Sequence, residues 1–150
     1  MTEFRLEELS ARTIVAANGL TLRKGQQDYL APVSYSMADA FTNPSTTWAR
    51  VVLADDAVVG FIRGNFDPTH SREEFRSCLW RINVAAEWQG KGVGRFAVQE
   101  LLKEAKSRGF ARLTVIWERG EMGPGEFFER IGFTPVGETE YGEVIGAIDV

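Results

Sequence analysis

The amino-acid sequence predicts one α/β domain (equally described as α+β) spanning residues 1–150, with helices flanking a mixed, mostly antiparallel central sheet. The length is that of a single ordinary domain. Short β-favouring runs and amphipathic runs succeed one another without a linker, repeat or low-complexity segment. Their predicted order is strand, helix, helix, strand, strand, strand, helix, strand, helix, strand, strand, which gives a mixed sheet covered by helices.

The first elements are short. Residues 4–9 alternate apolar and charged side chains, as a half-buried strand does. Residues 10–20 predict a helix that Ser10 can cap and that ends at a following Asn-Gly pair. Residues 34–41 predict a second short helix, which stops before Pro44 because the residue before proline avoids helical angles.

Two strands follow at 48–54 and 58–63, and Asp55-Asp56 between them favours a hairpin. Residues 64–77 are polar and predict a long loop that contains the only histidine, His70. A solvated loop histidine is the simplest interpretation, and a lone histidine without ligand spacing predicts no metal site.

The C-terminal part predicts a strand at 111–118 and a helix at 125–131, which Gly132 ends. Two further strands are expected at 133–136 and 143–148. They would form a hairpin around the intervening Tyr-Gly pair.

The central stretch, residues 79–108, reads as strand, glycine turn and amphipathic helix. Three glycines stand at alternate positions, Gly90, Gly92 and Gly94, directly before the helix. Fixing glycine costs conformational entropy, so this spacing needs a reason. The first turn of a helix offers unpaired N–H groups and partial positive charge, and missing side chains let an anion approach them. The stretch therefore predicts a phosphate-binding turn.

Two common phosphate motifs are absent from this turn. The dinucleotide fingerprint would need a glycine where Arg95 stands, and no G-x-x-x-x-G-K-[ST] run occurs. The turn instead reads Q-x-x-G-x-G from Gln89 to Gly94, with Lys91 and Arg95 adding positive charge beside it. A merely glycine-rich strand-to-helix turn is the alternative interpretation.

Composition and charge narrow the classes of partner and compartment that are expected for this protein. A net charge of −4 argues against a nucleic-acid partner and is compatible with a cationic substrate. The acidic start of the chain does not resemble a signal peptide, and no apolar run is long enough to span a membrane. The single cysteine, Cys78, suits a reducing compartment, so we expect a cytoplasmic protein with a buried structural thiol.

The Q-x-x-G-x-G turn resembles the acyl-CoA pyrophosphate loop of the GNAT superfamily of N-acetyltransferases. FFERIGF at 127–133 is similar to that family's helix ending. The tail 137–150 and the segment 31–41 are similar to the small polyamine acetyltransferases. The resemblance implies an enzyme that transfers an acetyl group from acetyl-CoA to the primary amine of a small molecule, with polyamines as one candidate class.

The resemblance also implies a site between two splayed strands, the central one and 111–118. Backbone groups of Ile82, Asn83 and Val84 would pair with the pantetheine arm, and the Val84 N–H would stabilise the oxyanion. No metal is implied. The implied cofactor-binding residues are Ile82, Asn83, Val84, Gln89, Gly90, Lys91, Gly92, Val93, Gly94, Arg95 and Phe128.

Two positions depart from the family's pattern. Phe128 stands where many members carry a tyrosine acid, and Trp80 stands where polyamine members often carry an acidic residue. Three explanations remain open. Proximity and the oxyanion N–H can suffice; the chain can bind acyl-CoA without turnover; or another side chain can substitute, the candidates being Tyr141 as acid, Tyr35, Glu118 and Glu73.

Two further alternatives stay open at this point. The acceptor can be a peptide or protein amine, which would need an open groove instead of a closed pocket. Apolar side chains on the C-terminal strands could support a homodimer.

Overall fold

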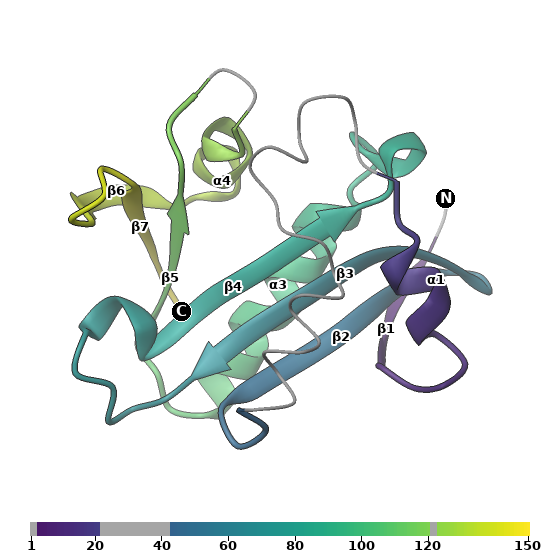
Figure 1. The fold of residues 1–150 in the computed structure, drawn as a ribbon, viewed down its shortest axis with the longest axis horizontal. Coiled ribbons are helices and arrows are strands. Elements are labelled where there is room, and N and C mark those ends of the chain that lie inside the picture. Colours follow the sequence, from purple (N-terminus) through teal and green to yellow (C-terminus); the bar gives the residue numbers. More distant parts are fainter. Residues whose placement is uncertain (1–2, 22–42, 121–122) are drawn as a thin grey trace.

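The computed structural model describes residues 3–21, 43–120 and 123–150. In these residues seven strands form one sheet in the order β1-β2-β3-β4-β5-β7-β6 (Figure 1). The strands are β1 (Phe4–Glu8), β2 (Thr47–Ala54), β3 (Ala57–Phe66), β4 (Ser77–Val84), β5 (Arg112–Trp117), β6 (Thr134–Glu138) and β7 (Val144–Asp149). The helices are α1 (Ile14–Asn18), α3 (Val93–Ser107) and α4 (Gly125–Ile131), with 3₁₀ turns η2 (Glu73–Phe75) and η3 (Ala86–Trp88).

The predicted mixed, mostly antiparallel sheet is confirmed. Every strand pair is antiparallel except β4 with β5, which is parallel. That parallel contact is short, because only Cys78 with Thr114 and Leu79 with Val115 are partners. Beyond Leu79 the two strands diverge, as Figure 1 shows. The splayed central strands expected from the sequence are therefore present.

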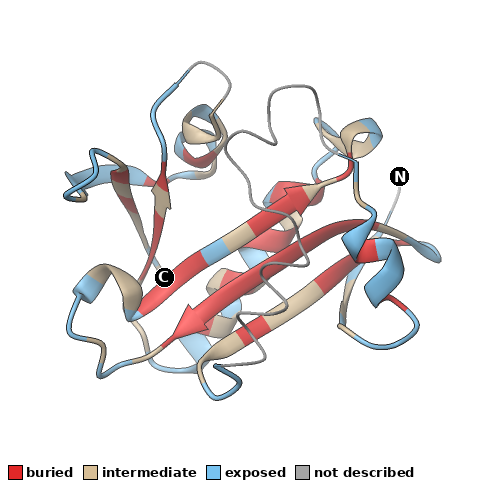
Figure 2. Ribbon diagram, viewed as in Figure 1, coloured by how far each residue is buried: buried red, intermediate tan, exposed pale blue. Residues whose placement is uncertain are grey.

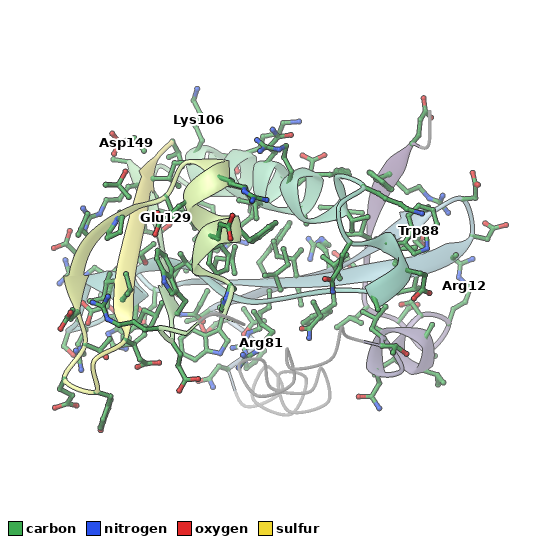
Figure 3. All side chains as sticks on the ribbon, turned by 90° about the horizontal axis from the view of Figure 1, so that it is seen from above. Arg12, Arg81, Trp88, Lys106, Glu129 and Asp149 are labelled. Carbon is green, nitrogen blue, oxygen red and sulfur yellow. The ribbon has the colours of Figure 1, made fainter. Side chains whose placement is uncertain are left out.

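Helices cover both faces of the sheet. On β2 and β3, Val52 and Ile62 pack in the cluster that contains the buried face of α3. Val51 and Phe61 pack on the other face against Ala17 of α1. Figure 3 shows α3 and α1 on opposite sides of the sheet. Because both faces are covered, β3 is buried along most of its length (Figure 2).

The helix α3 begins and ends as its sequence predicts. Its buried positions include Val93, Ala97, Leu101 and Ala105, which form one stripe facing the sheet. Gly109 follows the helix with φ +86°. The Phe110 N–H donates to the Ala105 carbonyl at 3.1 Å, and the Gly109 N–H donates to the Lys106 carbonyl at 3.0 Å. These are the two hydrogen bonds of a Schellman cap.

Three predicted elements need correction. The helix expected at 10–20 is helical only at Ile14–Asn18, because residues 10–13 form a turn in which the Ser10 carbonyl accepts from the Thr13 and Ile14 N–H groups. The loop expected at 64–77 is too long: residues 64–66 continue β3, since they pair with Leu79, Cys78 and Ser77 of β4. The strand expected at 133–136 runs from Thr134 to Glu138. The helix expected at 34–41 lies outside the described residues.

Candidate active site

The glycine turn lies between η3 and α3, and its three glycines serve two different purposes. Gly90 and Gly92 have φ of +78° and +93°, a region that residues with a Cβ rarely adopt. Gly94 has ordinary helical geometry, but a Cβ there would lie 2.6 Å from the Phe127 ring. The first two glycines therefore shape the turn, and the third lets α4 pack against α3.

The amides of this turn are not used by the described part of the protein. The first helical hydrogen bond runs from the Phe96 N–H to the Gly92 carbonyl at 3.0 Å, and no N–H of residues 90–95 donates to another described residue. A Cβ on Gly90 would meet nothing within 4 Å, and one on Gly92 would meet only the Phe4 ring at 3.9 Å. The turn thus presents open backbone donors at the positive end of a helix.

The polar and charged side chains beside the turn make contacts within the protein. The Lys91 ammonium lies 5.3 Å from the centre of the Trp88 ring. The Arg95 guanidinium donates to the Arg130 carbonyl at 3.5 Å. Gln89 has a structural contact as well: its side-chain amide donates to the Val84 carbonyl at 2.9 Å and so ties the turn to the end of β4.

The direction of the backbone in β4 follows from one hydrogen bond. The Ala85 N–H donates to the Val59 carbonyl of β3 at 2.9 Å. Because hydrogen-bonded and non-hydrogen-bonded pairs alternate along an antiparallel ladder, the backbone polar groups of Val84 and Ile82 point away from β3, toward the gap beside β5. Those of Asn83 point toward Phe61 on β3. The expected pairing of the Asn83 backbone with a ligand in the gap is therefore wrong.

A cavity of about 380 Å³ lies where β4 and β5 separate. Trp80 enters its wall at a β-bulge: Arg63 is the partner of Arg81 and Gly64 is the partner of Leu79, which leaves Trp80 as the extra residue. The lining residues are Phe75, Cys78, Leu79, Trp80, Arg81, Ile82, Val115, Ile116, Trp117, Glu118, Pro124, Phe128 and Glu143.

The bulge exposes part of an otherwise buried strand. Trp80 is 36% exposed, and Figure 2 shows this break in the middle of β4. Its ring lies 5.8 Å from that of Phe75 and 5.3 Å from the Arg63 guanidinium. Figure 3 places Arg81 on the sheet face opposite α3, so the bulge contributes to that side of the cavity.

Phe128 and Trp117 form the aromatic floor of the cavity. Phe128 is 3% exposed and its ring lies 5.6 Å from that of Trp117. The indole of Trp117 fits between two glycines, since a Cβ on Gly125 would come within 2.7 Å of it and one on Gly146 within 2.5 Å. Phe128 carries no ionisable proton, so these two rings shape the cavity but supply no acid.

Of the described acids and tyrosines proposed from the sequence as catalytic groups, one lines the cavity and two do not. Glu118 lines the cavity. Glu73 does not line it and pairs with Arg112 at 3.2 Å. Tyr141 is 82% exposed in the turn between β6 and β7 and is not a lining residue, so the geometry gives it no support as an acid. Tyr35 lies outside the described residues.

Sequence reasoning missed Glu143, which lines the cavity from the start of β7. Its Oε1 accepts from the Thr139 hydroxyl at 3.1 Å. The sequence carried no signal for it, because Glu143 reaches the cavity only through the pairing of β7 with β5.

Cys78 is a buried thiol in the cavity wall. Burial raises its pKa to about 12, although the nearby Arg63 charge opposes this shift. A neutral, buried thiol is a weak nucleophile, which agrees with the structural role expected for it. The described residues contain no group of three or more metal-ligating side chains. No helix among them is long and apolar enough to cross a bilayer.

The fold and site together define an α/β domain whose central parallel strand pair opens beside a glycine-rich helix start. The sequence model of the family described as "Acetyltransferase (GNAT) family" matches residues 14–133. The chain therefore belongs to the acetyltransferase (GNAT) family, and it is an acetyl-CoA-dependent N-acetyltransferase. No curated protein matches the chain.

Solved structures with the same fold cover nearly the whole chain. PaiA N-acetyltransferase from Thermoplasma acidophilum, in complex with coenzyme A, is 15% identical over 99% of both chains, with a TM-score of 0.73. The ribosomal-protein-S18-alanine N-acetyltransferase from Escherichia coli is 18% identical over 99% of this chain and 94% of that chain, with a TM-score of 0.70. Ard1 from Thermoplasma volcanium is 14% identical over 98% of this chain and 97% of that chain, with a TM-score of 0.71.

Proposed function

We propose that residues 1–150 form one catalytic domain that acetylates the primary amine of a small molecule by direct attack on the thioester of acetyl-CoA. One observation carries the proposal: the amides of residues 90–95, which donate to no other described residue, lie at the end of a strand pair that opens into a cavity. The pyrophosphate would accept from these amides. Coenzyme A in the PaiA relative supports this assignment.

The pantetheine arm would extend along β4. The backbone groups of Ile82 and the N–H of Val84 point into the gap, while the Val84 carbonyl is held by Gln89. The Val84 N–H would donate to the thioester oxygen as it becomes an oxyanion. This assignment needs no side-chain donor, which agrees with the apolar character of both residues.

The reaction forms a C–N bond and breaks a C–S bond. An alkylammonium must first lose a proton, because its pKa lies near 10.4 and only about one molecule in 10³ is neutral at pH 7. After attack, the sulfur leaves as a thiolate and takes the second proton that the nitrogen releases. A thiol pKa near 8.5 makes this leaving group an easy one. Phe128 at the floor therefore does not prevent turnover.

Several classes of amine fit this scheme. The tail 137–150 resembles that of polyamine acetyltransferases, and the Escherichia coli relative is named for an alanine of a ribosomal protein. We propose a small molecule because the described lining forms a cavity of about 380 Å³. A cytoplasmic location, as expected from the single cysteine, and a homodimer through the C-terminal strands complete the proposal.

A second candidate function is a non-catalytic acyl-CoA-binding module, which the lack of an acid or base group at Phe128 and Trp80 favours. Release of free thiol from acetyl-CoA across a panel of alkyl amines, polyamines and peptide amines separates the two. Turnover with any small amine supports the enzyme. Thermal stabilisation by acetyl-CoA without release of thiol would support the binding module instead.

A further inference from the structure

Two acidic residues line the cavity where β5 ends and β7 begins, Glu118 and Glu143. The pairing of β5 with β7 ends at Trp117 with Val144, and Glu118 and Glu143 are the next residue of each strand, so the geometry points to the two lying side by side just beyond the ladder. Residues directly opposite in an antiparallel pair have Cβ atoms roughly 4.5–5.5 Å apart and lie on the same side of the sheet. Both residues line the cavity. Like charges in this arrangement destabilise a sheet.

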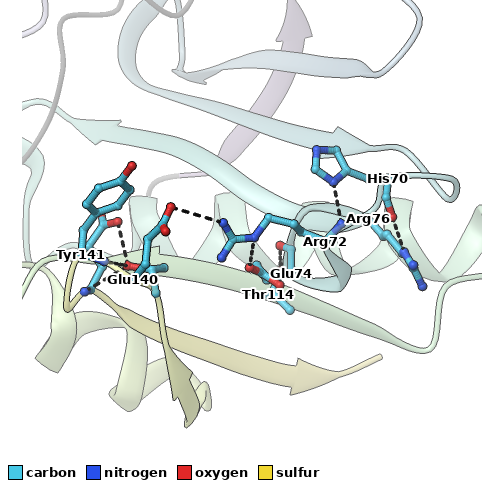
Figure 4. A network of polar contacts seen from close by, with 9 residues as sticks. His70, Arg72, Glu74, Arg76, Thr114, Glu140 and Tyr141 are labelled. Carbon is cyan, nitrogen blue, oxygen red and sulfur yellow. Dashed lines mark hydrogen bonds and ion pairs between the residues drawn. The ribbon is translucent and has the colours of Figure 1, made fainter.

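Acids close to this pair have cationic partners, whereas these two have none among the described residues. Glu138 on β6 pairs with Arg119. Glu140 lies 3.9 Å from Arg72, an ion pair that Figure 4 shows at the turn between β6 and β7. By contrast, among the described residues the Glu143 carboxylate accepts only from the Thr139 hydroxyl, and Glu118 has neither a hydrogen bond nor an ion pair with a described residue.

The rest of the described lining is largely apolar and aromatic. The partly exposed rings of Phe75 and Trp80 lie 5.8 Å apart and form one wall. Trp117 and Phe128 form the floor. Arg81 is the one basic residue among the described lining residues. Aromatic surfaces favour flat apolar groups, and one ammonium has enough N–H donors to serve two neighbouring carboxylates.

We propose that the acceptor is an arylalkylamine: a single ammonium held between Glu118 and Glu143, with a flat apolar ring against Phe75 and Trp80. This inference rests on the proposed acetyl transfer and names its substrate class. A polyamine carries several separated charges and would need carboxylates spaced along the cavity. The described lining instead places its two carboxylates side by side.

The test compares three amines as acceptors for acetyl-CoA: 2-phenylethylamine, butylamine and spermidine. Butylamine has the same charge as 2-phenylethylamine but no ring. We expect kcat/KM to be highest for 2-phenylethylamine. Glu118→Gln and Glu143→Gln should each raise its KM about ten-fold or more, the size expected for a lost charge-assisted hydrogen bond. Glu138→Gln is the matched control, because it removes a nearby carboxylate outside the cavity, and it should leave KM unchanged.

A second readout separates a substrate role from a structural one. Because the two carboxylates repel each other, Glu118→Gln should raise the melting temperature of the free protein while it weakens acceptor binding. A purely structural carboxylate would lower the melting temperature when neutralised. Trp80→Leu should reduce kcat/KM for 2-phenylethylamine more than for butylamine, since only 2-phenylethylamine has a ring that would lose its contact with the indole.

The outcomes distinguish this inference from the proposed function. Preference for spermidine, or a 2-phenylethylamine KM that neither glutamine variant changes, overturns the arylalkylamine assignment and leaves acetyl transfer standing. Calorimetric binding of 2-phenylethylamine to the CoA-bound protein is measured alongside. Binding that requires both carboxylates, without release of thiol, supports the acceptor site and removes the proposed catalysis. Absence of both binding and turnover overturns the inference.

Discussion

Replacing Gly92 by valine should abolish binding of coenzyme A while the domain stays folded. The backbone of Gly92 has φ +93°, and a Cβ at this position would have no neighbour closer than the Phe4 ring at 3.9 Å. Valine therefore fits sterically, and the expected loss of stability is the backbone strain of about 1–2 kcal/mol. Its branched side chain would stand over the amides that the pyrophosphate is proposed to contact.

The effect on affinity is larger than the effect on stability. A hydrogen bond to a charged group contributes about 1.5–3 kcal/mol. Loss of two such bonds costs about 3–6 kcal/mol, which is roughly 10²–10⁴ in Kd at 1.4 kcal/mol per factor of ten. Isothermal titration calorimetry with CoA measures this change directly, and thermal unfolding of the free protein measures the strain.

Gly109→Val is the matched control for strain. Gly109 has φ +86° and nothing within 4 Å of its Cβ position, but it ends α3 at the opposite end from the turn. The two variants should lose similar stability, and only Gly92→Val should lose CoA affinity. Unchanged CoA binding in Gly92→Val, or an equal loss in Gly109→Val, would refute the assignment of the turn.

Three further predictions concern charge, packing and pH. Lys91→Ala should weaken CoA binding a few-fold, with the difference shrinking at high salt in titrations, because an exposed lysine is screened. Gly146→Ala should lower stability by about 1–3 kcal/mol in denaturant titrations, since its Cβ would lie 2.5 Å from Trp117, whereas Gly137→Ala, with 4.0 Å of room, should lose much less. Burial raises the pKa of the Cys78 thiol to about 12. Between pH 9 and 12 the thiol is therefore ionised in the unfolded chain but still protonated in the folded protein. The free energy of unfolding falls over this range by up to about 1.4 kcal/mol per pH unit. Cys78→Ala should lack that part of the decline when melting temperatures are compared across pH.

Much of the chemistry of the turn was predictable because it depends on local properties. Gly90 and Gly92 indicate a left-handed backbone, and the apolar stripe of α3 predicts the helix that follows. The end of that helix also depends on a local property, the left-handed backbone of Gly109. Helix periodicity, capping and glycine conformation act over a few residues, and the sequence records them directly.

Features that depend on which strands pair could not be read in this way. Gly64 and Asn65 are strand because Leu79 and Cys78 pair with them, not because of their own propensity. The misplaced prediction for Asn83 has the same origin, since the direction of a backbone amide depends on the register with β3.

The sequence by itself determined the order of the elements, the glycine turn and the absence of a tyrosine at 128. Tertiary structure decided where β4 leaves β5, which places Trp80 and Phe75 on one wall of a cavity. It also decided that β5 pairs with β7, which brings Glu118 and Glu143, the residues just beyond that pairing, to the same cavity. Local propensities act within one segment, whereas the site is formed by side chains that only sheet register brings together.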